Sequence, residues 1–419
     1  MPADDLGHIA ALDRRLTEAV RGVRILRTVA LPPAQGKAFL AGHAAGQLRM
    51  PKPSYRAVDL REARTELEAI HAAIPWGHPL AGYLQRATDA WHTATLMLDA
   101  VGTARAGDLS AQLYGRPQDT IPGTLISSAQ AAREFVAVAG ELGSTIDDPA
   151  ELHDIDAATL RTELRQALDA YFGAGAVAVE LDPDLTAKAA AGAARIRLRE
   201  GSRFSAYDRH QLLMHEAFVH TLTARNGHAQ PVLSSLARTS PHATATQEGL
   251  AVFSELISGG MDLARLKRVS LRILGIEQAL AGADFIEVFR YFLGQGQDAE
   301  DSYASTARIF RGVPLTGGSA FAKDTVYLHG LLCVHTFFRW ALRGRRMALL
   351  RQLFAGKMAL RDVLDFEPWF AQGALAMPAV LPPWMANMQG LAGSLAFSLF
   401  VNRIPMEDVS AATWCLPVG

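Results

Sequence analysis

Apolar residues recur at three- and four-residue steps through most of this 419-residue chain. That spacing places them on one face of an α-helix, and abundant alanine favours the same structure. The pattern is clearest in REARTELEAIHA (61–72) and AGYLQRATDAWHTATLMLDA (81–100). It continues at 127–142, 157–172, 208–224, 246–258, 262–281, 284–293, 324–343 and 346–355. The chain is therefore predicted to be mainly α-helical.

Strand patterns are few. Residues 23–31 and 54–60 are predicted to form short strands. VAVEL (177–181) and RIRLR (195–199) are predicted to be strands on either side of a helix over 182–194, and the alternation in RIRLR indicates one solvent-facing side. The predicted fold class is mainly α with a small β element (α+β).

A polar, turn-rich stretch at 145–160 divides the chain. We predict a helical N-terminal region over 1–150 and a catalytic domain over 151–419. The apolar stretch at 381–401 contains prolines, glycines, Asn387 and Gln389, which are too many interruptions for a bilayer span. It is predicted to be a helix buried in the protein core.

Composition narrows the functional class. Hydrophobic residues make up 49% of the chain, and 41 Lys+Arg balance 42 Asp+Glu. A dedicated nucleic-acid binder needs a basic face, so nucleic acid is not expected as a partner. A membrane is not expected either, because the interrupted apolar stretch at 381–401 cannot span a bilayer. Acidic Asp4 and Asp5 do not fit a secretory signal. Cys333 and Cys415 alone cannot form a disulfide scaffold, which fits the cytoplasm.

Two segments carry metal chemistry: HEAFVH (215–220) and TQEGLA (246–251). Two imidazoles and a carboxylate can hold zinc and leave a fourth position for water. His215, His220 and Glu248 are the candidate ligands. Glu216 follows a ligand without being one, so it is the candidate base that takes a proton from that water.

The spacing of the two histidines is unusual. They lie at i and i+5, and on a regular α-helix five residues turn about 500°, so the rings would point about 140° apart. One metal ion can meet both rings only if the helix contains a π-type bulge, which adds a residue to one turn, or if His220 lies where the helix distorts. We therefore predict an i to i+5 irregularity here. Two alternatives remain open: half-buried histidines of an ordinary polar helix, and a first-turn helical role for Glu248.

These motifs carry a family resemblance. The chain contains HEAFVH, TQEGLA, SAQLYGRP (110–117), RIFRGVPLTGG (308–318) and FAKDTVYLHG (321–330), and these motifs follow one another along the chain in the same order as in a known family. The resemblance covers roughly residues 20–400. The chain resembles the bacterial QEGLA-motif, or flavohaemoglobin expression-modulating, proteins, which are similar to the microtubule-associated tyrosine carboxypeptidases of animals.

The resemblance implies a helical zinc-metallopeptidase-like core with one zinc ion bound by His215, His220 and Glu248, and with Glu216 as the base. It implies a carboxypeptidase acting on a peptide or protein C-terminus. The animal members carry an acidic residue where this chain has Gln247. Their tubulin substrate is not transferred to this chain.

A peptidase needs further groups. A hydrogen-bond donor must stabilise the tetrahedral oxyanion, and a carboxypeptidase needs a cation for the substrate carboxylate. The candidate oxyanion donors are Tyr327, Lys323 and His329; the candidate carboxylate ligands are Arg225, Arg311 and Lys323. His210 is interpreted as a neighbour of the site or a surface histidine. Glu255 is either a hydrogen-bond partner of a ligand histidine or a surface glutamate.

Two other functional classes stay open. One is a regulatory or scaffold protein with a structural or vestigial metal site, and the other is a zinc hydrolase of a non-peptide amide. The oligomeric state does not follow from the sequence.

Overall fold

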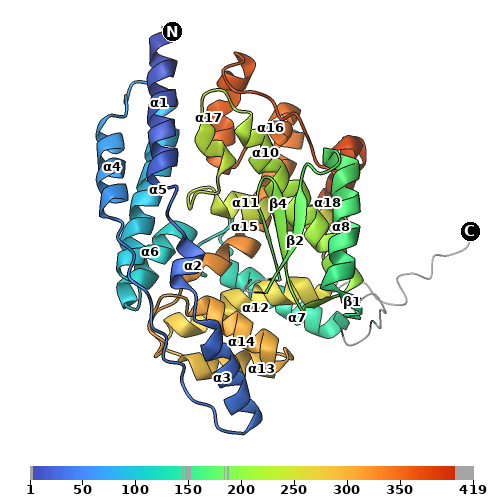
Figure 1. The fold of residues 1–419 in the computed structure, drawn as a ribbon. Coiled ribbons are helices and arrows are strands. Elements are labelled where there is room, and N and C mark those ends of the chain that lie inside the picture. The colour runs from blue at the N-terminus through green and yellow to red at the C-terminus, as the bar shows by residue number, and fades with distance from the viewer. Residues whose placement is uncertain (1–2, 144–145, 147–151, 184, 186–187, 402–419) are drawn as a thin grey trace, which may run out of the picture.

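A computed structural model describes residues 3–143, 146, 152–183, 185 and 188–401. The secondary structure of residues 3–143 is helical: α1 (Ala3–Ala19), α2 (Ile25–Val29), α3 (Pro33–Ala44), α4 (Arg61–Ala72), α5 (Ala81–Asp99), α6 (Ala104–Tyr114) and α7 (Ser128–Gly143). Figure 1 shows the blue N-terminal helices α1, α4 and α5 along one side of the molecule. One large buried apolar cluster contains residues from Ile9 to Leu395.

A small β element follows. Its members are β1 (Ile155–Asp156), α8 (Ala157–Phe172), β2 (Ala178–Asp182), β3 (Ala189–Ala191), β4 (Arg195–Arg199) and β5 (Arg203–Phe204). The strands β2, β4 and β3 form one sheet in that order, with β2 parallel and β3 antiparallel to β4. The strands β1 and β5 pair antiparallel. Figure 1 shows β2 and β4 on the side away from the blue helices.

Helices and the turns between them make up the described residues after β5, from 205 to 401. This part contains α9 (Ala206–Leu212), the π-helix η2 (Leu213–Thr221), α10 (Leu222–His228), η3 (Ser234–Ala237), α11 (Thr244–Ile257), α12 (Leu263–Leu280), α13 (Phe285–Gly294), α14 (Ala299–Ile309), η4 (Ala322–Asp324), α15 (Thr325–Arg343), α16 (Met347–Gln352), α17 (Leu360–Ala371), η5 (Pro383–Asn387) and α18 (Met388–Val401). The prediction of a mainly α fold with a small β element is confirmed.

The π-helix η2 lies between two cores. Ala217 and Phe218 join the smaller cluster formed with α8 and the sheet. Val219 belongs to the large helical cluster, together with Leu222 of α10. Because apolar side chains hold both faces, the backbone of η2 is fixed where the candidate ligands lie.

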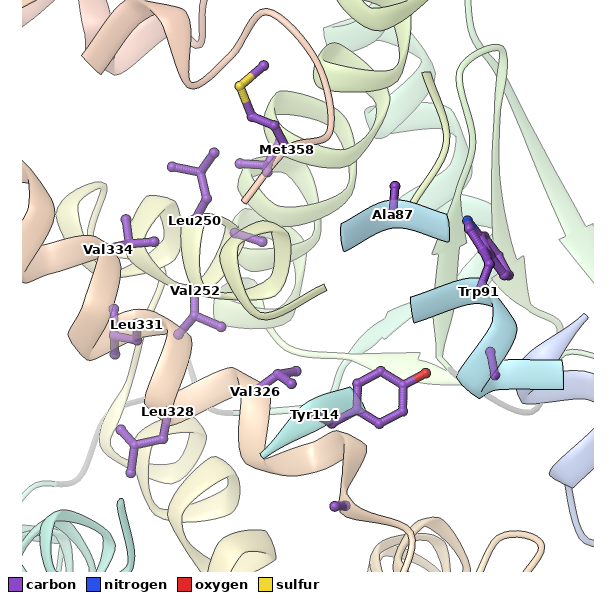
Figure 2. Packing of buried hydrophobic residues seen from close by; sticks show 14 of the residues in the cluster. Ala87, Trp91, Tyr114, Leu250, Val252, Val326, Leu328, Leu331, Val334 and Met358 are labelled. Atoms are coloured by element: carbon purple, nitrogen blue, oxygen red, sulfur yellow. The ribbon is translucent and has the colours of Figure 1, made fainter. Parts of the chain in front are cut away.

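A glycine contact brings α11 against α15. A Cβ atom built on Gly249 would lie 2.2 Å from the carbonyl carbon of Gly330. Only glycine permits this approach of two backbones. Figure 2 shows side chains of both helices in the core beside this crossing, including Leu250 and Val252 of α11 and Leu331 and Val334 of α15. The crossing sets Glu248 of α11 next to the start of α15.

Four local predictions were wrong. Residues 25–29 form helix α2, and residues 54–60 form no strand, because neither segment has a partner strand among the described residues. Residues 189–191 pair with β4 as a strand instead of continuing a helix. Over residues 388–398, for which burial is described, α18 is mostly exposed: Phe397 is 67% accessible, and Leu395 is the one buried residue in that range.

No helix among the described residues is long and apolar enough to cross a bilayer. The predicted domain boundary at residue 150 falls in 147–151, outside the described residues, as does Cys415.

Candidate metal centre

The three predicted ligands converge. His215 Nε2 lies 3.5 Å from Glu248 Oε2, and His220 Nε2 lies 3.6 Å from the same oxygen. A tetrahedral zinc ion with ligand bonds of about 2.0–2.1 Å sets its ligand atoms about 3.4 Å apart. One ligand atom from each residue lies within 4.8 Å of the others. The donor types and their separations therefore fit zinc.

The π-helix explains this convergence. His215 and His220 both lie in η2, and their ring centroids are 4.8 Å apart with the planes at 81°. The wider turn of η2 brings residues five apart onto one face. The predicted i to i+5 irregularity is confirmed, and a regular helix with diverging histidines is excluded. Ser205 starts α9, the helix before η2, with a capping box to Asp208.

His215 is held by a buried ion pair. Its Nδ1 is 2.6 Å from Oε1 of Glu255, which is fully buried and forms a two-bond ion pair with Arg265. The Glu255 bond fixes the ring so that Nε2 faces Glu248. Burial by itself lowers the pKa of His215, but hydrogen bonds with Glu248 and Glu255 raise it to about 10. The surroundings of this imidazole therefore favour positive charge, as a metal site requires.

The second histidine, His220, has fewer hydrogen bonds to fix its ring than His215 has. Its Nδ1 is buried and has no hydrogen-bond partner among the described residues. Burial lowers the pKa of this imidazole, the hydrogen bond with Glu248 acts against burial, and the charge of His215 lowers it further. His220 is thus the ligand whose orientation depends most on its own helix.

Lys323 holds the third ligand. Its Nζ donates to Glu248 Oε1 at 2.9 Å and to the Tyr327 hydroxyl at 3.2 Å. Burial raises the pKa of Glu248, but the charge of Lys323 and hydrogen bonds with the two histidines keep it well below its usual range. Lys323 therefore positions Glu248 through Oε1 and leaves Oε2 facing the histidines.

Tyr327 lies at the end of a charged network. Its hydroxyl oxygen accepts from Lys323 and from Arg308 at 3.3 Å. Arg308 also makes two bonds to buried Asp324, at 2.5 and 2.6 Å. Because the oxygen already accepts twice, the hydroxyl hydrogen is available for donation.

Glu216 differs from the other charged groups of the centre. It is half-buried and makes no hydrogen bond or ion pair with a described residue. Its charge nevertheless acts on His215 and on Lys357. A carboxylate held near the ligands without a partner is available to exchange protons.

Several predicted residues lie elsewhere. Arg225 donates to the Ala176 carbonyl and lies over the Phe172 ring. His329 is hydrogen-bonded to Ser128 of α7, and His210 donates to the Ser258 carbonyl. Glu255 is the buried partner of His215, so its surface alternative is wrong.

Arg311 lies near the network. It is partly exposed, and burial together with the charge of Arg308 lowers its pKa to about 10. The charge of Asp324 acts on it in the opposite direction.

Sequence reasoning missed two residues. Tyr114, at the end of α6, is buried and has a pKa raised to about 12, mainly by burial, with the charges of Lys323 and Glu248 also acting on it. It lies in SAQLYGRP, so the resemblance contained a signal for it. Lys357 is buried, which lowers its pKa, and the charges of Glu248 and Glu216 act to raise that pKa. No motif in the sequence marks it.

No curated protein matches the chain. Among solved structures, metallocarboxypeptidase 1 of Trypanosoma cruzi is similar over 88% of this chain and 92% of its own, with 12% identity and a TM-score of 0.41. The family model described as microtubule-associated tyrosine carboxypeptidase matches residues 37–403. That match supports a carboxypeptidase-like function, and because it covers most of the chain, this protein belongs to the microtubule-associated tyrosine carboxypeptidase family.

Proposed function

We propose that this protein is a zinc-dependent carboxypeptidase that removes C-terminal residues from a peptide or protein. One zinc ion per chain would be held by His215, His220 and Glu248. The observation that carries this proposal is the convergence of three ligand atoms beside an unpaired carboxylate, Glu216. The sparse cysteine content supports a cytoplasmic location.

The bound zinc supplies Lewis-acid chemistry, which lowers the pKa of water and polarises a carbonyl. Glu216 then acts as the base: its free carboxylate accepts a proton from the attacking water. The same group donates that proton to the leaving amine when the peptide bond breaks. Glu216 suits both steps because no described residue occupies its oxygens.

Tyr327 supports the oxyanion. Its hydroxyl oxygen is bonded by Lys323 and Arg308, so its hydrogen is free to be donated to the carbonyl oxygen as negative charge develops there. The hydrogen bonds from the two cations hold the Tyr327 hydroxyl in place. In this arrangement Lys323 acts through Glu248 and Tyr327.

The experiment has two stages. Metal content is measured by mass spectrometry on purified wild type and on His220→Ala. About one zinc per chain, lost in the variant, supports the site. Wild type is then incubated with peptides that carry free C-termini, and the released amino acids are identified.

The results separate the rival functions. A chain that binds no zinc, even after zinc is added back, contradicts the site and favours a regulatory or scaffold protein. Bound zinc with no amino acid released contradicts the peptidase, and hydrolysis of simple acylated amines would then favour a non-peptide amidase.

A further inference from the structure

Two buried lysines lie near the metal centre, and only one is paired. Lys323 has an ion pair with Glu248 and a hydrogen bond with Tyr327. Lys357 is equally buried, at 6% exposure, but its Nζ has one hydrogen bond, to the Thr239 hydroxyl at 2.9 Å. It makes no ion pair with a described residue. Two of its three ammonium hydrogens are therefore left for another acceptor.

The loop that carries Lys357 is firmly held. Asn226 and Gln230, at and just beyond the end of α10, donate to the carbonyls of Phe354 and Ala355. The backbone nitrogen of Lys357 itself donates to the Leu236 carbonyl at 2.7 Å. Since α10 continues directly from η2, the helix that carries the histidines also fixes the position of this lysine.

No carboxylate of the described residues forms an ion pair with the Lys357 ammonium. Burial lowers its pKa to about 8, although the charges of Glu248 and Glu216 favour the protonated form. A buried ammonium without a hydrogen-bonded counterion costs free energy. An anionic ligand that reaches Nζ would remove that cost.

The place of this cation matches one part of the proposed substrate. The C-terminal carboxylate is attached to the same α-carbon as the leaving amine, so it must lie on the side where that amine is protonated. That is the side of Glu216, and Lys357 lies close enough to the centre for the charges of both Glu248 and Glu216 to act on it. Arg311 instead clusters with Arg308, Asp324 and Tyr327.

We propose that Lys357 binds the terminal carboxylate of the substrate, through the ammonium hydrogens that Thr239 does not use. This assignment rests on the proposed carboxypeptidase function. It makes Lys357 the residue that distinguishes a chain end from an internal peptide bond.

The test measures binding without turnover. The probe is an N-acetylated pentapeptide ending in tyrosine, the residue named by the family, with a ketomethylene group in place of the last amide. It is prepared as the free acid and as the C-terminal amide. Calorimetry on zinc-loaded wild type at pH 7 should show the acid binding about 10- to 100-fold more tightly, as for a hydrogen bond to a charged group.

In Lys357→Met the acid should bind as weakly as the amide, while the amide affinity stays unchanged. A purely structural lysine would weaken both probes equally, and that result overturns the assignment. Acid and amide binding equally well to wild type overturns it too. If neither probe binds any zinc-loaded form, the carboxypeptidase proposal itself fails.

Arg311→Met keeps the test decisive if Lys357→Met does not fold. Arg311 is partly exposed and makes no hydrogen bond with a described residue, so this variant should fold. Survival of the acid preference in Arg311→Met supports Lys357. Its loss assigns the carboxylate to Arg311 and overturns the proposal.

Discussion

The two sides of the metal centre differ in how completely their charges are paired. On the α11 and α15 side, Glu248 is bonded to Lys323, Lys323 to Tyr327, and Arg308 to both Tyr327 and Asp324. On the other side, formed by η2 and the loop of Lys357, Glu216 has no partner among the described residues, and among them the Lys357 ammonium is bonded only to the Thr239 hydroxyl.

This difference distinguishes charged residues that stabilise the fold from charged residues that can act on a substrate. Paired charges hold one another in place, and removing one leaves the others buried without compensation. An unpaired charge contributes little to holding the fold but can bind a ligand or exchange a proton. We therefore expect substitutions on the paired side to reduce stability, and substitutions on the unpaired side to reduce function.

The largest effect is expected for Glu216→Gln. Turnover of a C-terminal peptide should fall by about 10²–10⁴-fold because general acid and base catalysis is lost. Zinc content and the midpoint of urea unfolding should match wild type, since Glu216 holds nothing in place. Loss of zinc together with activity would instead make Glu216 part of the scaffold and break the comparison.

Asp324→Asn should have the largest effect on stability. Asp324 is the buried partner of Arg308, with Arg272 3.8 Å away, so neutralising it should lower the free energy of unfolding by about 3–5 kcal/mol. Glu180→Gln, which breaks an exposed pair with Arg195, should cost at most about 1 kcal/mol. Urea titrations compare the two, and equal small losses would show that burial of the network matters less than we argue.

Lys357→Met should raise the free energy of unfolding at pH 7, whereas Asp324→Asn should lower it. The pKa of Lys357 falls from 10.5 unfolded to about 8 folded, so between those pH values the unfolded chain binds more protons and stability rises with pH. Metal-free wild type should gain up to about 3 kcal/mol over that range relative to Lys357→Met. At pH 7 the variant should be the more stable protein. Parallel unfolding curves at pH 7 and pH 10 would refute this expectation.

Gly249→Ala should lower the free energy of unfolding by a smaller amount. Its structural effect should be confined to α11 and α15, where the charges are paired. The new methyl group would collide with the Gly330 backbone, so α11 and α15 must move apart at a cost of about 1–3 kcal/mol. Zinc affinity, measured against a chelating dye, should fall because Glu248 moves with α11. Gly140→Ala in α7, where a Cβ meets nothing, serves as the control and should stabilise the protein by about 0.5–1 kcal/mol.

The convergence of the three candidate ligands was easier to predict from the sequence than their surroundings. His215, His220 and Glu248 occur in two short segments, and the i+5 spacing is incompatible with a regular α-helix if both histidines bind one metal ion. The strand at 189–191 was missed because alanine favours helices, whereas pairing with Arg197 and its neighbours outweighed that preference. Lys357 was not predictable, since only the folded chain brings its loop to Glu216.

The wider turn of η2 also sets the rotation of α10, which continues directly from it, about the helix axis. Each residue that the turn absorbs would otherwise rotate the following helix by about 100°. If η2 relaxed to an α-helix around His215, His220 would leave the ligand set, and Asn226 and Gln230 would swing away from the loop they hold. One local change of helical pitch therefore keeps two things in register: the metal ligands, and the cation that we assign to the end of the substrate.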